Sequence, residues 1–192
     1  MKFAGWFTGL LTPGTVRASK AVVTNSTKDI TGLRNNTITG RSQWLTQGPS
    51  SGEVAAGAAL AVSAALHAGR TIRLETLAGS VCTLPAATGS GNRYRFRVGV
   101  LATSVSHIIK VTGTDIMQGL ILGARTDSGN AVLGFACAAD SDTITLNRTT
   151  TGSVNLGEFV ECEDVAAGVW QVNGLLSATG AAFATPFSAT VP

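Results

Sequence analysis

From about residue 59 onward, the chain is a succession of short hydrophobic runs separated by turn residues. Within the runs, apolar and polar side chains alternate with period two, which is typical of strands that bury one face. The turns are rich in Gly, Asn, Asp and Ser, as in "GSGN" and "TDSGN". The predicted strands are Ala59–Val62, Thr71–Leu74, Val81–Leu84, Tyr94–Val100, His107–Val111, Leu120–Leu122, Ala131–Phe135, Thr143–Leu146, Glu158–Glu163 and Val169–Leu176.

The spacing of these runs predicts the fold class. Turn signals that recur every eight to twelve residues or so indicate an all-β domain and not alternating βαβ units. We expect an antiparallel β-sandwich or jelly-roll-like barrel of about ten short strands. The segment "EVAAGAALAVSAALHAG" is rich in alanine, but Gly57 interrupts it and its apolar residues form no stripe, so we expect at most a helical turn near Ser63–Leu66.

Residues 1–52 hold no sustained periodicity of either kind. We therefore assign residues 1–55 to an extended N-terminal arm and linker, and residues 56–192 to a β-rich body with an extended C-terminal tail. Alone, such an arm buries too little apolar surface to offset its ordering entropy, so we expect it to order on a partner. The alternative is that it packs back on its own domain. Its candidate anchors are Phe3, Trp6, Phe7, Leu10, Leu11 and Trp44.

Charge is concentrated in the same segment. Residues 1–50 hold six basic side chains against Asp29, a net charge of +5, whereas residues 51–192 hold eight basic and ten acidic ones, a net charge of −2. A basic arm can contact nucleic acid, an acidic membrane surface or an acidic protein partner. The basic side chains of the arm are Lys2, Arg17, Lys20, Lys28, Arg34 and Arg41.

The bulk composition agrees with one extended, turn-rich domain. The chain has 192 residues, of which 23 are Gly and only 13% are charged. No apolar run approaches the roughly eighteen residues that a membrane helix requires. The start "MKFAGWFTGLLTPG" lacks a small-residue cleavage site and contains glycines and a proline, so we do not expect export.

The stretch "GEFVECEDVAAGVWQVNGLL" holds four acidic residues just before a tryptophan. Its alternation predicts a β-hairpin in which Glu161 and Glu163 share one face, roughly 7 Å apart, and Trp170 faces the core. Inverting glycosidases place two carboxylates roughly 6.5–9.5 Å apart, but any solvated strand gives the same spacing. Nothing local makes the two acids unlike each other, as a catalytic pair requires. We interpret them as a water-facing or interfacial pair.

A second charged stripe lies in "RYRFRV", where Arg93, Arg95 and Arg97 alternate with apolar residues and so share one face of a strand. These arginines can form ion pairs with Glu161 and Glu163 on a neighbouring strand or subunit. They can also bind nucleic acid, but RNA-binding sheets expose their aromatic residues, and here the aromatics lie on the opposite face. We favour ion pairing.

Two loops resemble known ion sites. Gly89-Ser90-Gly91 can cradle a phosphate only where the loop opens a helix, and here it precedes a strand. Asp140–Asp142 resembles the start of a calcium loop but lacks the glycine and distal glutamate that such a loop needs, so we interpret it as a turn.

The cysteines and histidines also suggest structural roles. Cys82, Cys137 and Cys162 are widely spaced in apolar contexts, which favours three buried thiols. His67 and His107 have neither a metal-ligand spacing nor a companion acid. We therefore expect no catalytic residue, no cofactor and no metal.

Several phrases of the chain resemble a known family. "TLPAATGSGNRYRFRVG", "SHIIKV", "SDTITLN" and "EDVAAGVWQVNGLLSATG" are similar to small virion structural proteins of tailed bacteriophages, the capsid decoration (cement) proteins, over roughly residues 59–190. The resemblance implies no enzymatic activity, assembly as a homotrimer and attachment to the major capsid protein. It transfers no catalytic residue.

We therefore expect a capsid-stabilising protein on the exterior of the virion, made in the host cytoplasm. Its expected partners are the major capsid protein and itself, with neither a membrane nor nucleic acid. The stretch "KDITGLRNNTITG" resembles linkers of phage fibre and appendage proteins. The alternative is thus a trimeric head-fibre or tail-appendage protein that binds host surface glycans. A polysaccharide hydrolase is a more distant third.

Overall fold

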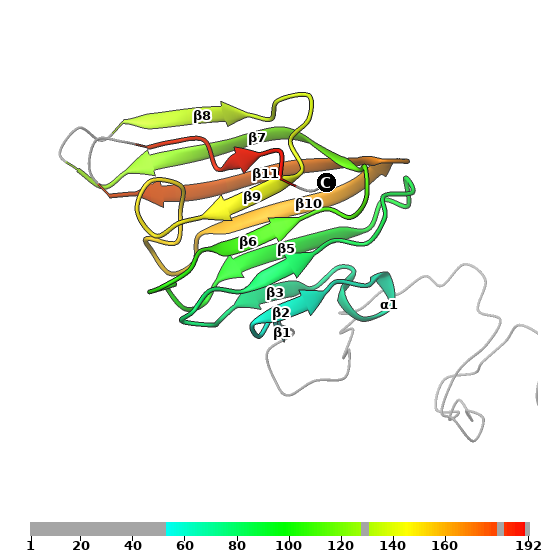
Figure 1. Ribbon diagram of the computed structural model, residues 1–192, viewed down its shortest axis with the longest axis horizontal. Helices are drawn as coiled ribbons and strands as arrows, with labels where there is room; N and C mark the ends of the chain where they lie inside the picture. The colour runs from blue at the N-terminus through cyan, green and yellow to red at the C-terminus, as the bar shows by residue number, and fades with distance from the viewer. Residues whose placement is uncertain (1–52, 128–130, 180–182, 191–192) are drawn as a thin grey trace, which may run out of the picture. The chain divides into compact units, whose positions relative to one another are not determined.

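The computed structural model describes residues 53–127, 131–179 and 183–190, which are almost entirely strands and turns (Figure 1). Within these residues the single helix, α1, is one turn, Ala64–His67, close to the predicted position. The strands are β1 (Glu53–Ala55), β2 (Ala59–Ala61), β3 (Thr71–Leu74), β4 (Val81–Thr83), β5 (Arg93–Val98), β6 (His107–Lys110), β7 (Ile116–Arg125), β8 (Val132–Ala136), β9 (Thr143–Leu146), β10 (Phe159–Ala166), β11 (Val169–Ala178) and β12 (Phe187–Ser188).

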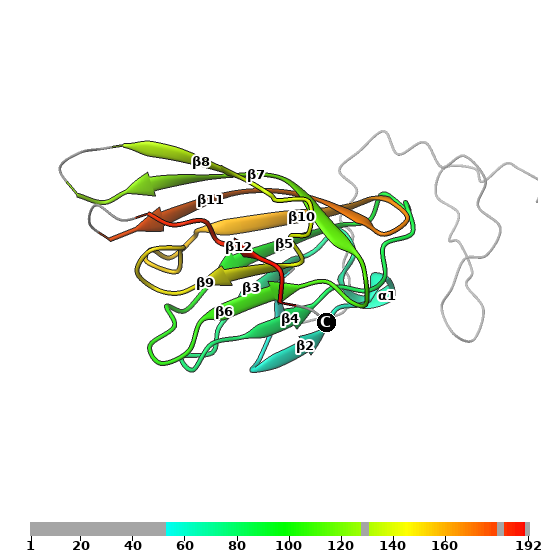
Figure 2. The ribbon, with the colours of Figure 1, turned by 45° about the horizontal axis from the view of Figure 1, so that its top comes forward.

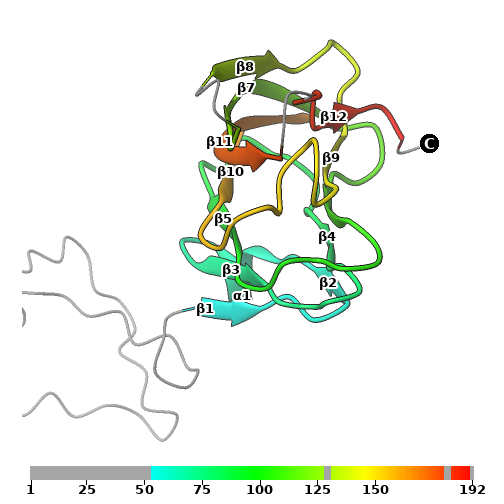
Figure 3. The same cartoon turned by 90° about the vertical axis from the view of Figure 1, so that its left-hand side faces the viewer.

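These strands form two sheets, and the all-β prediction is confirmed for the described residues. The seven-stranded sheet has the order β1-β3-β5-β10-β11-β7-β8, and the five-stranded sheet has the order β12-β9-β6-β4-β2. The two sheets lie face to face as two layers (Figures 2 and 3).

The sheets are mixed, so the prediction of an antiparallel fold is wrong. From β1 to β6 the chain alternates between the sheets, which makes β1, β3 and β5 parallel neighbours in one and β2, β4 and β6 parallel neighbours in the other. β7 and β11 are also parallel. Side-chain alternation is the same in parallel and antiparallel strands that bury one face, so the sequence pattern does not distinguish them.

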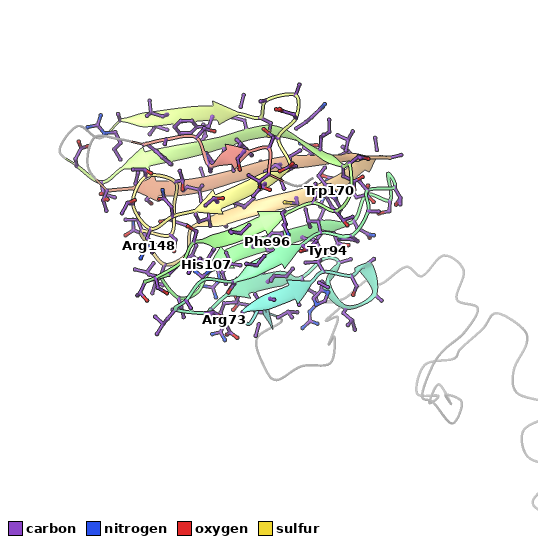
Figure 4. All side chains as sticks on the ribbon, viewed as in Figure 1. Arg73, Tyr94, Phe96, His107, Arg148 and Trp170 are labelled. Atoms are coloured by element: carbon purple, nitrogen blue, oxygen red, sulfur yellow. The ribbon has the colours of Figure 1, made fainter. Side chains whose placement is uncertain are left out.

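The core fills the space between the two layers. Tyr94, Phe96 and Trp170 are buried, and the Tyr94 and Trp170 rings meet at a centroid distance of 5.6 Å (Figure 4). Opposite them, the five-stranded sheet contributes Ile109 and Ile144. Because every second residue of each strand enters this layer, the intervening residues of the seven-stranded sheet form its outer face.

Two strands escaped the sequence pattern because they are too short to show periodicity. β1 pairs with β3 through three residues, so Glu53–Ala55 belongs to the seven-stranded sheet and not to a linker. β12 pairs with β9 through Phe187 and Ser188 in the segment predicted as a tail. By contrast, β7 is ten residues long, where the pattern predicted only Leu120–Leu122.

The hairpin of β10 and β11 is present but tighter than the sequence suggested. β10 continues to Ala166, with a register shift between Asp164 and Ala166, and Gly168 makes the turn with a φ of +74°. Asp164, which lies just beyond the predicted strand Glu158–Glu163, is therefore part of the strand. Its side chain is buried.

Candidate functional site

A ladder of ion pairs crosses the outer face of the seven-stranded sheet. β5 and β10 run antiparallel with Arg95 opposite Glu161 and Arg93 opposite Glu163. Arg95 Nη1 lies 2.6 Å from Glu161 Oε1, and Arg93 Nη2 lies 3.0 Å from Glu163. The sequence left open whether these groups meet between strands or between subunits, and the structure places these pairs within one chain.

The third arginine of the stripe has a partner that the sequence did not suggest. Arg97 donates from Nε and Nη2 to the two carboxylate oxygens of Glu53 in β1, at 2.8 and 2.7 Å. Such a two-point contact fixes the geometry of both side chains more strongly than a single hydrogen bond. It therefore ties β1 to β5 across the intervening β3.

The ladder gives Glu161 and Glu163 closely similar surroundings. Each is partly exposed and each is paired with one arginine of β5. A glycosidase pair needs one carboxyl group kept protonated and the other ionised, which requires different environments. Both carboxyl groups instead have the same kind of partner, an arginine of β5, so this arrangement suits a structural ladder better than acid–base chemistry.

Replacing both ladder carboxylates, Glu161→Gln with Glu163→Gln, is expected to change stability little. Partly exposed ion pairs are typically worth under about 1 kcal/mol each. Urea denaturation monitored by tryptophan fluorescence measures the difference, with the buried Glu158→Gln as the comparison that should cost more. A glycan-cleaving activity present in the wild type and lost in the double variant would contradict this interpretation.

The glycine-rich loop before β5 encloses a carboxylate of its own chain. Asp164 accepts hydrogen bonds from the backbone N–H groups of Thr88, Gly89 and Ser90 at 2.8, 2.6 and 3.1 Å, and from the hydroxyls of Thr88 and Ser90. Gly89 has a φ of +77°, a conformation that lets consecutive N–H groups converge on one anion. The place that a phosphate would occupy is therefore filled by Asp164.

This enclosure changes the acidity of Asp164. Burial acts to raise its pKa, but the hydrogen bonds from Ser90, Gly89 and Thr88 stabilise the carboxylate and hold the pKa at about 2, against the usual 3.8. Because the folded-state pKa is depressed, the carboxylate stabilises the fold above the pKa of the unfolded chain.

Acid is therefore expected to weaken the fold through Asp164 by about 2 kcal/mol, a loss that develops as the pH falls from about 4 to about 2. The measurement is the urea midpoint as a function of pH. The variant Asp164→Asn keeps the side-chain shape but cannot titrate, so this part of the pH dependence should disappear from it. If wild type and variant respond identically to acid over this range, the assignment is wrong.

Glu158 has a similar role at the opposite end of β10. Its carboxylate accepts backbone hydrogen bonds from Ser153 and Val154, both at 2.8 Å, and from Asn155. Ser153 has a φ of +63°, so the loop is shaped around the buried Glu158. Of the four acidic residues in the stretch "GEFVECED", Glu158 and Asp164 hold loops in place, and Glu161 and Glu163 connect β10 to β5.

The histidines are held by the backbone. His107 is buried, with Nδ1 accepting from the Ser80 N–H and Nε2 donating to the Val100 carbonyl, both at 2.9 Å. Burial lowers the pKa of His107, an effect that the contact with Val100 partly opposes. His67 Nδ1 accepts from the Ser63 N–H at 2.9 Å. Both imidazole rings therefore form hydrogen bonds with backbone groups, which is a structural role.

The three cysteines and Asp142 also have structural roles. Cys82 and Cys162 are buried and Cys137 is partly buried, and burial raises the pKa of the Cys82 thiol to about 12 and that of Cys137 to about 11. Asp142 accepts from the Thr143 hydroxyl and the Thr190 N–H. Within residues 53–127, 131–179 and 183–190, no cluster of side chains suits a metal ion.

The predicted arm residues lie outside the described part of the chain. These are Phe3, Trp6, Phe7, Leu10, Leu11, Arg17, Lys20, Lys28, Arg34, Arg41 and Trp44. No helix in the described residues is long and apolar enough to cross a membrane.

Comparisons with protein-family models, curated proteins and solved structures find no match to this chain. The function is therefore inferred from its own residues and geometry.

Proposed function

We propose that this protein is a capsid decoration (cement) protein of a tailed bacteriophage. It assembles as a homotrimer on the exterior of the virion, binds the major capsid protein lattice and stabilises the head. It is made in the host cytoplasm and has no enzymatic activity.

The observation that carries this proposal is that all four acidic residues in and next to β10 make structural contacts. Glu158 and Asp164 bind the backbone of adjacent loops, and Glu161 and Glu163 bind the arginines of β5. The side chains best suited to acid–base chemistry are thus engaged in holding strands and loops in place. A rigid, internally braced body is what a protein that reinforces an assembled shell requires.

In this proposal the body is a β-sandwich that begins at β1, and residues 1–52 are an extended arm. The two facing sheets support the assignment as a sandwich (Figure 3). The first six strands form parallel pairs within each sheet, whereas the strands of a jelly roll are antiparallel. An extended arm can cover a large area of a capsid for little folded mass. Its aromatic residues supply anchors, and its net charge of +5 suits acidic groups on the shell.

One observation favours the alternative, a head-fibre or tail-appendage protein that binds host glycans. A groove of about 520 Å³ lies over β3, β5, β10 and β11. Polar side chains that can hydrogen-bond a sugar line it, among them Thr71, Arg93, Arg95, Glu161, Gln171 and Asn173. Saccharide binding that weakens in Gln171→Ala, with capsid binding unchanged, would favour this alternative.

Cosedimentation with DNA-free capsids tests the decoration proposal. Capsids assembled from the major capsid protein of the same phage are mixed with the purified protein and pelleted, and bound protein is quantified. Full-strength attachment to empty shells supports a role on the capsid. Attachment that requires packaged DNA would instead assign the basic arm to the genome, and failure to bind either particle would end the proposal.

A further inference from the structure

The outer face of the seven-stranded sheet changes in character from one edge to the other. One row of side chains across the sheet is Glu53, Thr71, Arg95, Glu161, Asn173, Leu120 and Ala136. The next row is Ala55, Arg73, Arg97, Phe159, Leu175, Leu122 and Gly134. The half formed by β1, β3, β5 and β10 is charged, and the half formed by β11, β7 and β8 is mainly apolar.

The apolar half exposes large side chains to solvent in one continuous area. Leu120, Leu122 and Leu175 are 46, 39 and 51% exposed, and Val132 at the end of β8 is 66% exposed. Single exposed hydrophobic residues are ordinary, but several that adjoin on one sheet face mark an interaction surface. We call this surface the apolar face, made of Leu120, Leu122, Ala124, Val132, Gly134, Ala136 and Leu175.

The edge of the sheet beside this face is also open. β8 ends the strand order and, among the described residues, pairs only with β7 (Figure 1). The other three edge strands, β1, β2 and β12, have two or three residues each, whereas β8 has five. Proteins protect long edges with charges, prolines or bulges, and the β8 sequence "VLGFA" contains neither a charge nor a proline.

The charge pattern suits other copies of this chain as the partner. Copies that meet near a symmetry axis oppose each residue with its own equivalent, so a charged residue there meets a like charge. The apolar face contains no charged residue. The charged side chains of the sheet nearest to it are matched within the chain: Arg125 at the end of β7 pairs with Asp127, Arg95 with Glu161 and Arg93 with Glu163. The surroundings of the apolar face therefore offer little net charge to a partner of complementary charge.

We propose that the apolar face and the edge of β8 form the interface between copies of this chain. Three copies turn their apolar faces toward a common axis, which removes the leucines from water and shields β8 from uncontrolled strand pairing. The inference rests on the proposed homotrimer and assigns the surface that builds it. The charged half of the sheet then lies outside this interface.

Sedimentation velocity of the full chain at micromolar concentration tests the interface. The variant Leu122→Lys with Leu175→Lys places lysines on the apolar face, at positions that are 39 and 51% exposed in the single chain. Leu66→Lys with Leu156→Lys is the matched control, since both leucines are 65% exposed but lie in α1 and in the loop before β10. We expect a trimer for wild type and control. The face variant should associate at least about a hundredfold more weakly, because its lysines lose water in the interface.

A monomeric wild type, or a face variant that sediments like the control, overturns the interface. The first outcome indicates that another segment or partner covers the leucines, and the second that copies meet elsewhere. Circular dichroism of each variant verifies that the β-body is folded. Capsid cosedimentation is measured in parallel. If the chain binds capsids but does not associate through the apolar face, this inference alone is wrong. If the chain forms a trimer through the apolar face but does not bind capsids, the proposed function alone is wrong.

Discussion

Trp170→Ala is expected to destabilise the body by about 3–5 kcal/mol, the range for removing a large aromatic ring from a packed core. Trp170 is completely buried, tilted against Tyr94 and placed beside Met117 of β7. It lies in β11, between β10 and β7, so the cavity would open at the middle of the seven-stranded sheet. The urea midpoint at constant protein concentration measures the loss.

Two further variants show whether burial causes this effect. Gln171→Ala changes the adjacent residue on the exposed face and should stay within about 0.5 kcal/mol of wild type. Trp170→Phe should cost less than alanine, since Trp170 Nε1 is buried without a hydrogen-bond partner in the described chain and phenylalanine removes that unsatisfied donor. A loss below about 1 kcal/mol for Trp170→Ala would mean that the ring is not a core residue in solution.

The face that each strand buries was predictable from the sequence. In β5, Tyr94, Phe96 and Val98 enter the core while the three arginines remain on the outer face. In β11, Trp170 and Val172 also enter the core. Period-two alternation fixes these orientations locally, whichever strand lies alongside. The same rule placed the Arg and Glu side chains on one outer face before their partners were known.

Strand order was not predictable in the same way. The parallel pairing of β7 with β11 joins segments about fifty residues apart, and no local pattern specifies it. Arg97 contacts Glu53 for the same reason, since β1 reaches β5 only through β3. Such contacts depend on how the whole chain crosses between the sheets.

The buried acids and the apolar face were missed for two different reasons. Asp164 follows Glu163 in an apparently solvated hairpin, and only the distant Thr88–Ser90 loop reveals that its carboxylate is enclosed. In "LILGA" of β7, apolar residues occupy both parities, a pattern typical of a strand buried on both faces. The structure of one chain exposes Leu120 and Leu122, and self-association would restore the burial that the pattern indicates.

Deletion of residues 1–15 is expected to abolish capsid attachment or weaken it at least about a hundredfold, because aromatic anchors usually supply most of the energy of an interface. The deletion removes Phe3, Trp6, Phe7, Leu10 and Leu11. The body should remain folded, since its described sheets begin at Glu53. Cosedimentation with DNA-free capsids measures attachment, and the urea midpoint verifies the fold.

Charge reversal in the arm distinguishes the contribution of its aromatic anchors to affinity from the contribution of its basic residues to the rate of binding. Arg34→Glu with Arg41→Glu keeps every aromatic anchor and lowers the net charge of the arm from +5 to +1. Peripheral charges mainly accelerate and orient encounter, so this variant should bind more slowly and with an altered salt dependence while retaining attachment. The deletion should instead lose attachment at every salt concentration. If the reversal abolishes binding and the deletion does not, charge is the main attraction of the arm, and an acidic surface or nucleic acid becomes the partner to test.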